Sequence, residues 1–150
     1  DCCRRATKQR LAEHRDALRG ASMKILYWLM SALIAFVMGS GTLLHFRNPT
    51  YLLGFIPWSL PALPIIYVTG VVELVIAIAA LVPRTRGVAG LAFAALCAGY
   101  LPLHIWDLFR GDPVITPYAA AIIRVVVQLL FIGIGWLVWK RFKPATGFIA

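Results

Sequence analysis

The chain has 150 residues, of which 61% are hydrophobic and only 14% are charged, and its mean hydropathy is +0.80. An ordinary soluble core cannot hide so many apolar side chains, so the composition predicts a protein whose partner is the lipid bilayer. The net charge of +9 is compatible with binding to nucleic acid. Most of the basic residues lie in segments on one side of the apolar runs described below. We therefore expect the charge to set the orientation in the membrane, and we predict no nucleic-acid partner.

Residues 1–22 are polar and basic, and they contain no apolar signal region. Met23 followed by Lys24 resembles a native start, so this segment is predicted to be a dispensable extension, disordered or non-native. A short amphipathic helix on the cytoplasmic surface is the alternative. Because no cleavable secretory signal is visible, we expect the first apolar run to be retained as a membrane span.

Four apolar runs are each long enough to cross the hydrocarbon core, which takes about 20 helical residues. They cover residues 25–44, 62–82, 88–106 and 118–139. Short loops join them, so we expect one membrane domain over residues 23–143, an all-α transmembrane four-helix bundle, followed by a short tail at 144–150. Four buried helices of a soluble protein are the alternative, but such helices rarely come four in succession with hardly any polar face.

Basic residues are distributed unequally between the two sides that four crossings create. Twelve of them lie before the first span, between the second and third, or after the fourth: Arg4, Arg5, Lys8, Arg10, Arg15, Arg19, Lys24, Arg84, Arg86, Lys140, Arg141 and Lys143. The opposite side has only Arg47 and Arg110. The positive-inside rule then predicts that both termini are cytoplasmic, in a multi-pass protein of a bacterial-type inner membrane.

The segment between the first two spans, residues 48–64, is rich in proline and aromatic residues. Pro49 stands near its start, and Pro57, Pro61 and Pro64 follow in its second half. Because proline interrupts helices and favours extended backbone in the residue before it, we predict an interfacial loop. Tyr51, Phe55 and Trp58 are expected to dip into the headgroups, and the loop is expected to cover the mouth of the bundle.

Two charged residues lie at membrane depth, where an unpaired charge costs roughly 2.5 to 3.5 kcal/mol. Glu73 follows Pro64 by nine residues, which is about 13 Å along a helix, and Arg124 follows Tyr118 by six residues, about 9 Å. We therefore expect Glu73 and Arg124 to interact, directly or through one water. The pair could fix helix register, or it could form the floor of a pocket that opens away from the cytoplasm.

Other polar residues converge on the same outer half of the bundle. Gln128 follows Arg124 by one helical turn, and residues 100, 104 and 107 share one helix face. These positions define a candidate pocket: His45, Glu73, Tyr100, His104, Asp107, Arg124 and Gln128. Each has a structural alternative, since the histidines could meet only headgroups and water and Gln128 could simply join two helices.

Three stretches occur in chain order: "GTLLHFRNP", "IPWSLPALPIIYVTGVVELVIAIAALVPRTRGVAG" and "RVVVQ". Together they resemble the DoxX-like integral membrane proteins over residues 39–139. The matching positions are His45, Phe46, Tyr67, Gly70, Glu73, Arg84, Arg86, Arg124 and Gln128. The resemblance adds Tyr67 to the candidate pocket. The chain departs from the family at "LPLHIW", where His104 stands at the position of an asparagine in many relatives.

The resemblance implies association with membrane redox systems, including quinone-linked oxidoreductases. In one hypothesis the chain is the membrane subunit of an oxidoreductase with a soluble partner, its pocket holds a quinone headgroup, and Glu73 moves the accompanying proton. In the other it is a non-enzymatic scaffold or small-solute carrier, in which Glu73 and Arg124 form a structural pair. Neither hypothesis assigns a catalytic residue or a substrate.

The remaining motifs restrict the chemistry. His45 and His104 are candidate cofactor ligands, and bis-histidine haem is a weaker alternative to quinone. The sequence has no zinc spacing, phosphate loop or serine triad, so no metal site is predicted. Cys97 is expected to be an apolar packing residue, because no Cys-x-x-Cys motif is present. Glycine-rich stretches such as "GIGWL" allow close helix contacts and are compatible with a homo-oligomer.

Overall fold

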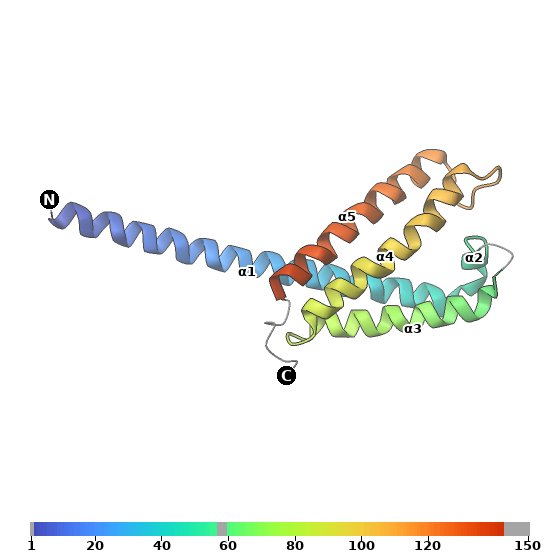
Figure 1. Cartoon of the computed structure of the whole chain (residues 1–150), viewed down its shortest axis with the longest axis horizontal. Coiled ribbons are helices and arrows are strands. Elements are labelled where there is room, and N and C mark those ends of the chain that lie inside the picture. The colour runs from blue at the N-terminus through green and yellow to red at the C-terminus, as the bar shows by residue number, and fades with distance from the viewer. Residues whose placement is uncertain (1, 57–59, 143–150) are drawn as a thin grey trace, which may run out of the picture.

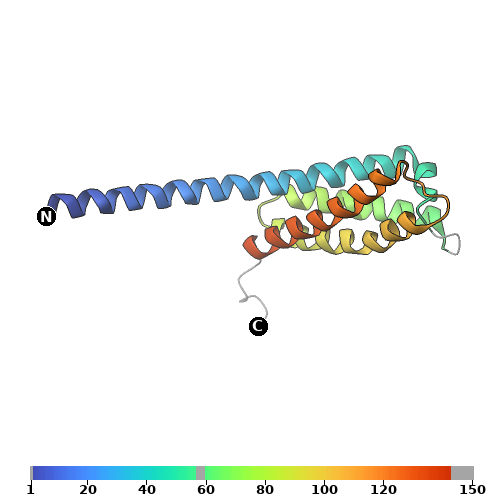
Figure 2. The ribbon, with the colours of Figure 1, turned by 90° about the horizontal axis from the view of Figure 1, so that it is seen from above.

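The computed structural model describes residues 2–56 and 60–142, with side chains at Arg10 and from His14 onward. Its helices are α1 (Cys2–Arg47), α2 (Pro49–Leu53), α3 (Ala62–Leu81), α4 (Arg86–Phe109) and α5 (Tyr118–Phe142). The four long helices run side by side as a bundle, and the short α2 lies at one end of it (Figure 1, Figure 2). The predicted all-α four-helix bundle is confirmed.

The outer surface of the bundle is apolar on all four long helices. Phe36 of α1 is 72% exposed, Val68 of α3 62%, Val88 of α4 53% and Ile123 of α5 61%. Each long helix also contains a stretch that is long and apolar enough to cross a membrane. Since a soluble protein rarely leaves such a continuous apolar surface in water, lipid is the solvent that fits it. The chain is a multi-pass integral membrane protein.

The first helix is much longer than the predicted span of residues 25–44. α1 runs without a break from Cys2 to Arg47, and its N-terminal part projects beyond the bundle (Figure 1). Residues 2–22, which the sequence suggested to be a dispensable extension with a helix as the alternative, form the N-terminal part of α1. These residues contain no proline and many good helix formers, so the helix that starts in the bundle has no reason to end there. The tail at 144–150 lies outside the described residues.

The segment predicted to be an interfacial loop is partly helical and turns inward. α2 occupies its first part, and Pro64 lies in the first turn of α3, where a missing backbone N–H breaks no helical hydrogen bond. Leu52 and Phe55 are buried against Ile66 of α3, with only 9% and 6% of their surfaces exposed. Phe55 therefore faces the bundle interior instead of the headgroups. Trp58 lies outside the described residues.

The loop between α4 and α5 is tied to the same end of the bundle. The carboxylate of Asp107 accepts hydrogen bonds from the backbone N–H groups of Val114, at 2.9 Å, and Ile115, at 3.4 Å. Arg110 donates from Nη1 to the carbonyl oxygen of Gly54, at 2.7 Å. These contacts join α2, residues 54–56 and the loop 110–117 into one layer across the end of the bundle, which we call the cover.

The long helices associate as two pairs, α1 with α3 and α4 with α5, which diverge toward the cover (Figure 1). The backbones of α4 and α5 approach each other closely where Gly90 meets Gly135. A Cβ atom at Gly135 would lie 2.6 Å from the carbonyl oxygen of Gly90, so only glycine fits this crossing. The glycine-rich stretch "GIGWL" thus packs against a helix of its own chain.

The half of the bundle that is distant from the cover is filled by apolar side chains. Ile34, Phe93 and Val138 come from three different helices and have no exposed surface. Arg86 closes the α3–α4 turn beside them, donating to the carbonyl oxygens of Ala80 and Leu81 at 3.3 and 3.4 Å. Because the last carbonyls of α3 lack helical partners, this buried arginine satisfies the end of that helix.

Candidate functional site

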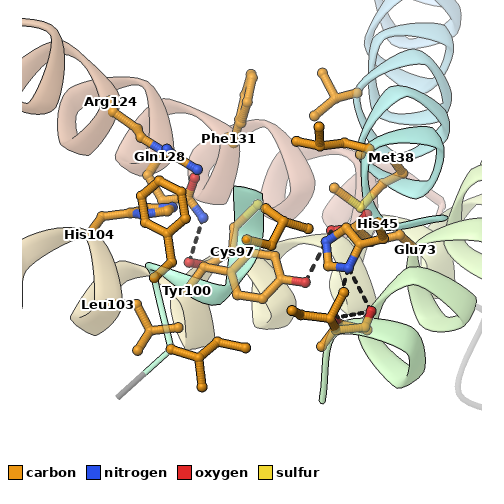
Figure 3. Close-up of a pocket in the computed structure, with 18 of the residues that line it drawn as sticks. Met38, His45, Glu73, Cys97, Tyr100, Leu103, His104, Arg124, Gln128 and Phe131 are labelled. Atoms are coloured by element: carbon orange, nitrogen blue, oxygen red, sulfur yellow. Dashed lines mark hydrogen bonds and ion pairs between the residues drawn. The ribbon is translucent and has the colours of Figure 1, made fainter. Parts of the chain in front are cut away.

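A cavity of about 290 Å³ lies between the two helix pairs, on the side of the cover. Most of its lining is apolar, and it includes side chains from all four long helices and from the cover. Among the described residues, seven polar ones line it: His45, Thr69, Glu73, Tyr100, His104, Arg124 and Gln128. Figure 3 shows them at two ends of the cavity, with His45 and Glu73 at one and His104, Arg124 and Gln128 at the other.

Glu73 is the buried acid of the site, with 3% of its surface exposed. Its Oε1 atom accepts a hydrogen bond from the Tyr100 hydroxyl at 3.0 Å and lies 3.5 Å from Nε2 of His45. Its Oε2 atom is buried and has no hydrogen-bond partner among the described residues. Gly41 of α1 makes room for this oxygen, since a Cβ atom there would lie 2.5 Å from it.

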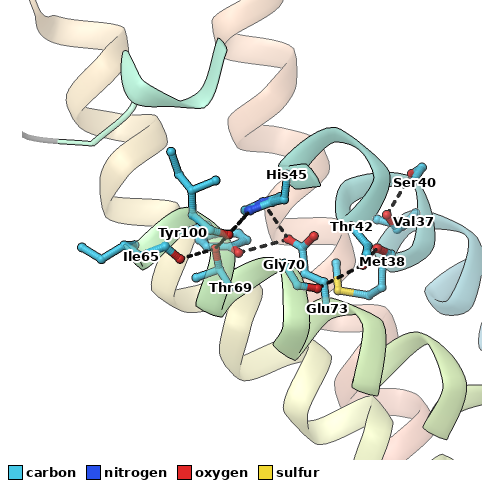
Figure 4. Close-up of polar contacts among 11 residues, drawn as sticks. Val37, Met38, Ser40, Thr42, His45, Ile65, Thr69, Gly70, Glu73 and Tyr100 are labelled. Atoms are coloured by element: carbon cyan, nitrogen blue, oxygen red, sulfur yellow. Dashed lines mark hydrogen bonds and ion pairs between the residues drawn. The ribbon is translucent and has the colours of Figure 1, made fainter. Parts of the chain in front are cut away.

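His45 is fixed by the backbone of the neighbouring helix α3 (Figure 4). Its Nδ1 atom lies 2.6 Å from the carbonyl oxygen of Ile66 and 3.2 Å from the Thr69 hydroxyl. The close approach is possible because Gly70 has no side chain: a Cβ atom there would lie 2.8 Å from Cβ of His45. Nearby, the Thr42 hydroxyl lies 3.3 Å from the carbonyl oxygen of Gly70 and joins the same two helices.

These contacts determine where the protons of His45 and Glu73 can be. A carbonyl oxygen only accepts hydrogen bonds, so Nδ1 of His45 carries a hydrogen and donates to Ile66. Nε2 then needs either its own proton, facing a carboxylate, or a protonated Glu73 to donate to it. A neutral histidine beside an ionised Glu73 would set two lone pairs against each other. One proton between Nε2 of His45 and Oε1 of Glu73, in addition to the hydrogen on Nδ1, would therefore match the two atoms as donor and acceptor.

The opposite end of the cavity is formed by α4 and α5. Gln128 is buried and donates from Nε2 to the carbonyl oxygen of Cys97 at 2.8 Å, which joins the two helices. His104 is only 9% exposed, and its Nδ1 atom has no hydrogen-bond partner among the described residues. The guanidinium carbon of Arg124 lies 4.6 Å from the centre of the Phe55 ring, a cation–π distance.

The expected direct contact between Glu73 and Arg124 is not formed. The ion pairs among residues 2–56 and 60–142 join His45 to Glu73 and Asp107 to Arg110. Figure 3 shows Glu73 and Arg124 at opposite ends of the cavity. Similar depth in the membrane was the basis of the prediction, but depth says nothing about which way a side chain points around its helix.

Two further candidates from the sequence do not line the cavity. Asp107 is 2% exposed and binds the backbone of the α4–α5 loop, so it stabilises the cover. Tyr67 is 43% exposed on the outside of α3, where its ring lies 5.9 Å from that of Phe46. Tyr67 thus contacts α1 through Phe46 at the outer edge of the α1–α3 contact, outside the cavity.

Sequence reasoning did not identify Gly41, Gly70 and Thr69 as parts of the site. A signal was present, because Gly41 and His45 are one turn apart on α1, and residues 66, 69, 70 and 73 follow the spacing of a single face of α3. Small and polar residues on two such faces indicate close helix contact in a membrane. Cys97 was expected to be a packing residue, and it is 2% exposed beside the cavity.

The site does not suit bis-histidine haem. Both nitrogens of His45 already face polar atoms, with Nδ1 toward Ile66 and Nε2 toward Glu73. His104 lies at the other end of the cavity, beyond the Tyr100 ring (Figure 3). Within the part of the chain that the structure describes, histidine, cysteine, aspartate and glutamate side chains form no group of three that could hold a metal ion.

The comparison with protein families identifies most of the bundle. The profile of a Domain of unknown function (DUF8561) matches residues 32–139, which is more than two thirds of the chain. The chain belongs to the DUF8561 family. This DUF8561 domain contains every residue that lines the cavity and leaves out the projecting part of α1. No curated protein and no solved structure matches the chain.

Proposed function

We propose that the chain is a membrane protein that binds a quinone-type headgroup in its cavity, as the membrane subunit of a redox system. One observation carries the proposal: Oε2 of Glu73 and Nδ1 of His104 are buried without partners among the described residues, on side chains that line one cavity. Buried polar atoms are costly unless they form hydrogen bonds. A ligand with hydrogen-bonding oxygens can supply the missing partners.

The size and lining of the cavity support a small, largely apolar ligand. Its volume of about 290 Å³ is at the lower limit of small-molecule sites, which hold roughly 300 to 1,000 Å³. A single-ring headgroup suits that volume, and its alkyl tail can extend into lipid. The resemblance to DoxX-like proteins, with their association with membrane redox systems, supports the same ligand class.

The proton held by His45 and Glu73 gives this site a chemical role. Reduction of a quinone to its hydroquinone takes up two electrons and two protons. The chain has no electron carrier of its own in this proposal, so the two electrons come from a soluble oxidoreductase partner. Glu73 passes one proton to the ligand through Oε2, and water from the open side of the cavity supplies the second proton and re-protonates the His45–Glu73 pair. The cavity then opens on the non-cytoplasmic side of a bacterial-type inner membrane.

A purely structural scaffold has less support. That alternative depended on a Glu73–Arg124 pair, and the two residues do not contact each other. A scaffold has no need for an unpartnered carboxylate oxygen beside a cavity, since burying such an atom only destabilises the fold.

Ligand-dependent stabilisation tests the proposal. The purified chain in lipid nanodiscs is heated with decyl-benzoquinone or with decylbenzene, which has the same tail and no oxygen. Specific binding raises the unfolding temperature with the quinone alone. Tyr100→Phe and Glu73→Gln should reduce the shift, whereas Tyr67→Phe, on the outer surface, should retain it. Equal shifts with quinone and decylbenzene would rule out a quinone site.

A further inference from the structure

The cavity has two polar ends of different chemistry, separated by the Tyr100 ring (Figure 3). At one end the Tyr100 hydroxyl contacts Glu73, and the proton of the His45–Glu73 pair can be donated or accepted. On the other side, the ring centres of Tyr100 and His104 are 6.4 Å apart. A ligand that reaches only Glu73 would therefore leave the second polar end without a partner.

The second end contains a cation, Arg124, that has no carboxylate in direct contact among the described residues. No carboxylate oxygen of the described residues lies within 4.0 Å of Arg124, because their two acidic contacts of that kind involve His45 and Arg110. The ring of Phe55 packs on the guanidinium at 4.6 Å, and the Tyr51 hydroxyl lies near it. The carboxylate of Asp107 acts on Arg124 from beyond 4.0 Å. A guanidinium has five N–H donors and accepts nothing, so these neighbours leave donors available for an oxygen atom.

His104 gives a second, independent indication at the same end. It is more than nine-tenths buried, it lines the cavity, and its Nδ1 atom has no partner among the described residues. Gln128 lies at the same end, where its Nε2 atom donates to the carbonyl oxygen of Cys97 and forms no hydrogen bond with Nδ1 of His104. The two residues Arg124 and His104 thus offer a donor and an unpartnered ring nitrogen to the same region of the cavity.

We infer that the cavity recognises its ligand at both ends, so that the ligand is a ring with two oxygen atoms on opposite sides, the para-quinone and hydroquinone class. One oxygen faces Glu73, and the other accepts hydrogen bonds from Arg124, with His104 beside it. This inference rests on the proposed function and makes it more specific. Because Arg124 only donates while the Glu73 end exchanges a proton, the two ends also orient the ligand.

Three probes with the same tail separate the two ends. Decylhydroquinone has both oxygens, whereas ortho-decylphenol and meta-decylphenol each lack a different one of them. Their affinities are measured in nanodiscs under nitrogen by competition with a photoreactive decyl-quinone, for the unaltered chain and for Arg124→Gln, Arg124→Lys and Glu73→Gln. Arg141→Gln is the matched control, because Arg141 is exposed at the far end of α5. Helicity and unfolding temperature without ligand verify that each variant is folded.

We expect Arg124→Gln to lower the affinity for decylhydroquinone and for one of the two phenols by about 10-fold or more. This is the effect of losing a hydrogen bond to a charged group. The affinity for the other phenol should not change with Arg124→Gln and should fall with Glu73→Gln. Arg124→Lys should give an intermediate loss, since it keeps the charge without the planar fork.

The outcomes that contradict the two proposals differ. If decylhydroquinone binds and depends on Glu73, but Arg124→Gln changes none of the three affinities, the second recognition end is wrong and the quinone-type site remains. If none of the probes competes, the proposed function fails and this inference fails with it. Should Arg124→Gln unfold the chain, Arg124→Lys and His104→Gln provide the same comparison, and unchanged affinities in both would overturn the inference.

Discussion

Nε2 of His45 and Oε1 of Glu73 lie 3.5 Å apart across the contact between α1 and α3. This contact depends on the backbone as well as on side chains, because Nδ1, the other ring nitrogen of His45, contacts the carbonyl oxygen of Ile66. Gly41 and Gly70 let the two helices approach closely enough for it. The acid Glu73 thus has an imidazole partner on the adjacent helix.

The first prediction concerns the energetic coupling of this pair. In a double-mutant cycle with His45→Gln and Glu73→Gln, the effects on the free energy of unfolding should be non-additive by about 0.5 to 3 kcal/mol, as for residues in one hydrogen-bond network. The parallel cycle for Glu73→Gln and Arg124→Gln should show a smaller coupling, because those side chains do not touch. Equal coupling in the two cycles would contradict the assigned partners. Reversible unfolding in mixed micelles provides the measurement.

The second prediction concerns the space beside Glu73. Gly41→Ala should destabilise the chain by about 1 to 3 kcal/mol, the usual effect of overpacking, because the new Cβ atom meets Oε2 at 2.5 Å. Gly39→Ala is the matched control on the same helix: a Cβ atom there meets nothing within 4 Å, so it should be neutral or slightly stabilising. Thermal unfolding of both variants checks the difference, and equal midpoints would show that the Gly41 contact does not matter.

The third prediction concerns the crossing of α4 and α5. Gly135→Ala pushes a methyl group toward the Gly90 carbonyl and should lower the unfolding temperature by several degrees. Gly133→Ala, two residues away on the same helix, has open space around its Cβ atom and should not do so. If both substitutions are tolerated equally, the close crossing is not required for stability.

The fourth prediction concerns the cover. Asp107→Ala removes the acceptor for two backbone N–H groups of the α4–α5 loop, which should cost about 1 to 3 kcal/mol locally. Hydrogen exchange at Val114 and Ile115 should accelerate, and Asp112→Ala, at an exposed position of the same loop, should leave it unchanged. Unaltered protection in Asp107→Ala would mean that other contacts hold the loop.

The fifth prediction concerns orientation in the membrane. With the native cysteines replaced, single cysteines at Asn48 and Gly111 should react with an impermeant reagent from the non-cytoplasmic side. A cysteine at Arg84, in the exposed α3–α4 turn, should be protected in sealed cells. The reason is the excess of basic residues on the side of that turn. The reverse labelling pattern would invert the topology and put the cavity on the cytoplasmic side.

The membrane spans could be predicted from the sequence, because about 20 consecutive apolar residues leave few alternatives in a chain of this composition. Polar residues of the cavity could be selected for a similar reason. Placing the side chains of His45, Glu73 and Arg124 in the membrane costs free energy, so such residues usually have a structural or functional role. Their partners could not be assigned. Distance along a helix gives the depth of a side chain, whereas its partner depends on rotation about the axis and on how neighbouring helices are staggered.

The cover and α1 illustrate two other limits of sequence reasoning. Phe55 lies among prolines and aromatic residues that favour an interface, but the divergence of the helix pairs opens a space that its ring fills. Asp107 shares a helix face with Tyr100 and His104, yet it is far enough along α4 to reach the following loop. The length of α1 was underestimated because a change from apolar to polar residues marks the edge of the membrane and does not end a helix.

The apolar packing around Ile34, Phe93 and Val138 occupies the bundle on the side of the α3–α4 turn. Met38 and Cys97 belong both to this packing and to the lining of the cavity, so within the described residues the cavity ends against the packed apolar side chains. Whatever occupies the cavity enters and leaves by way of the cover or sideways from the lipid. A bound compound then enters and leaves on the same side of the packed apolar residues. This arrangement suits binding and release of a compound better than its conduction across the bilayer.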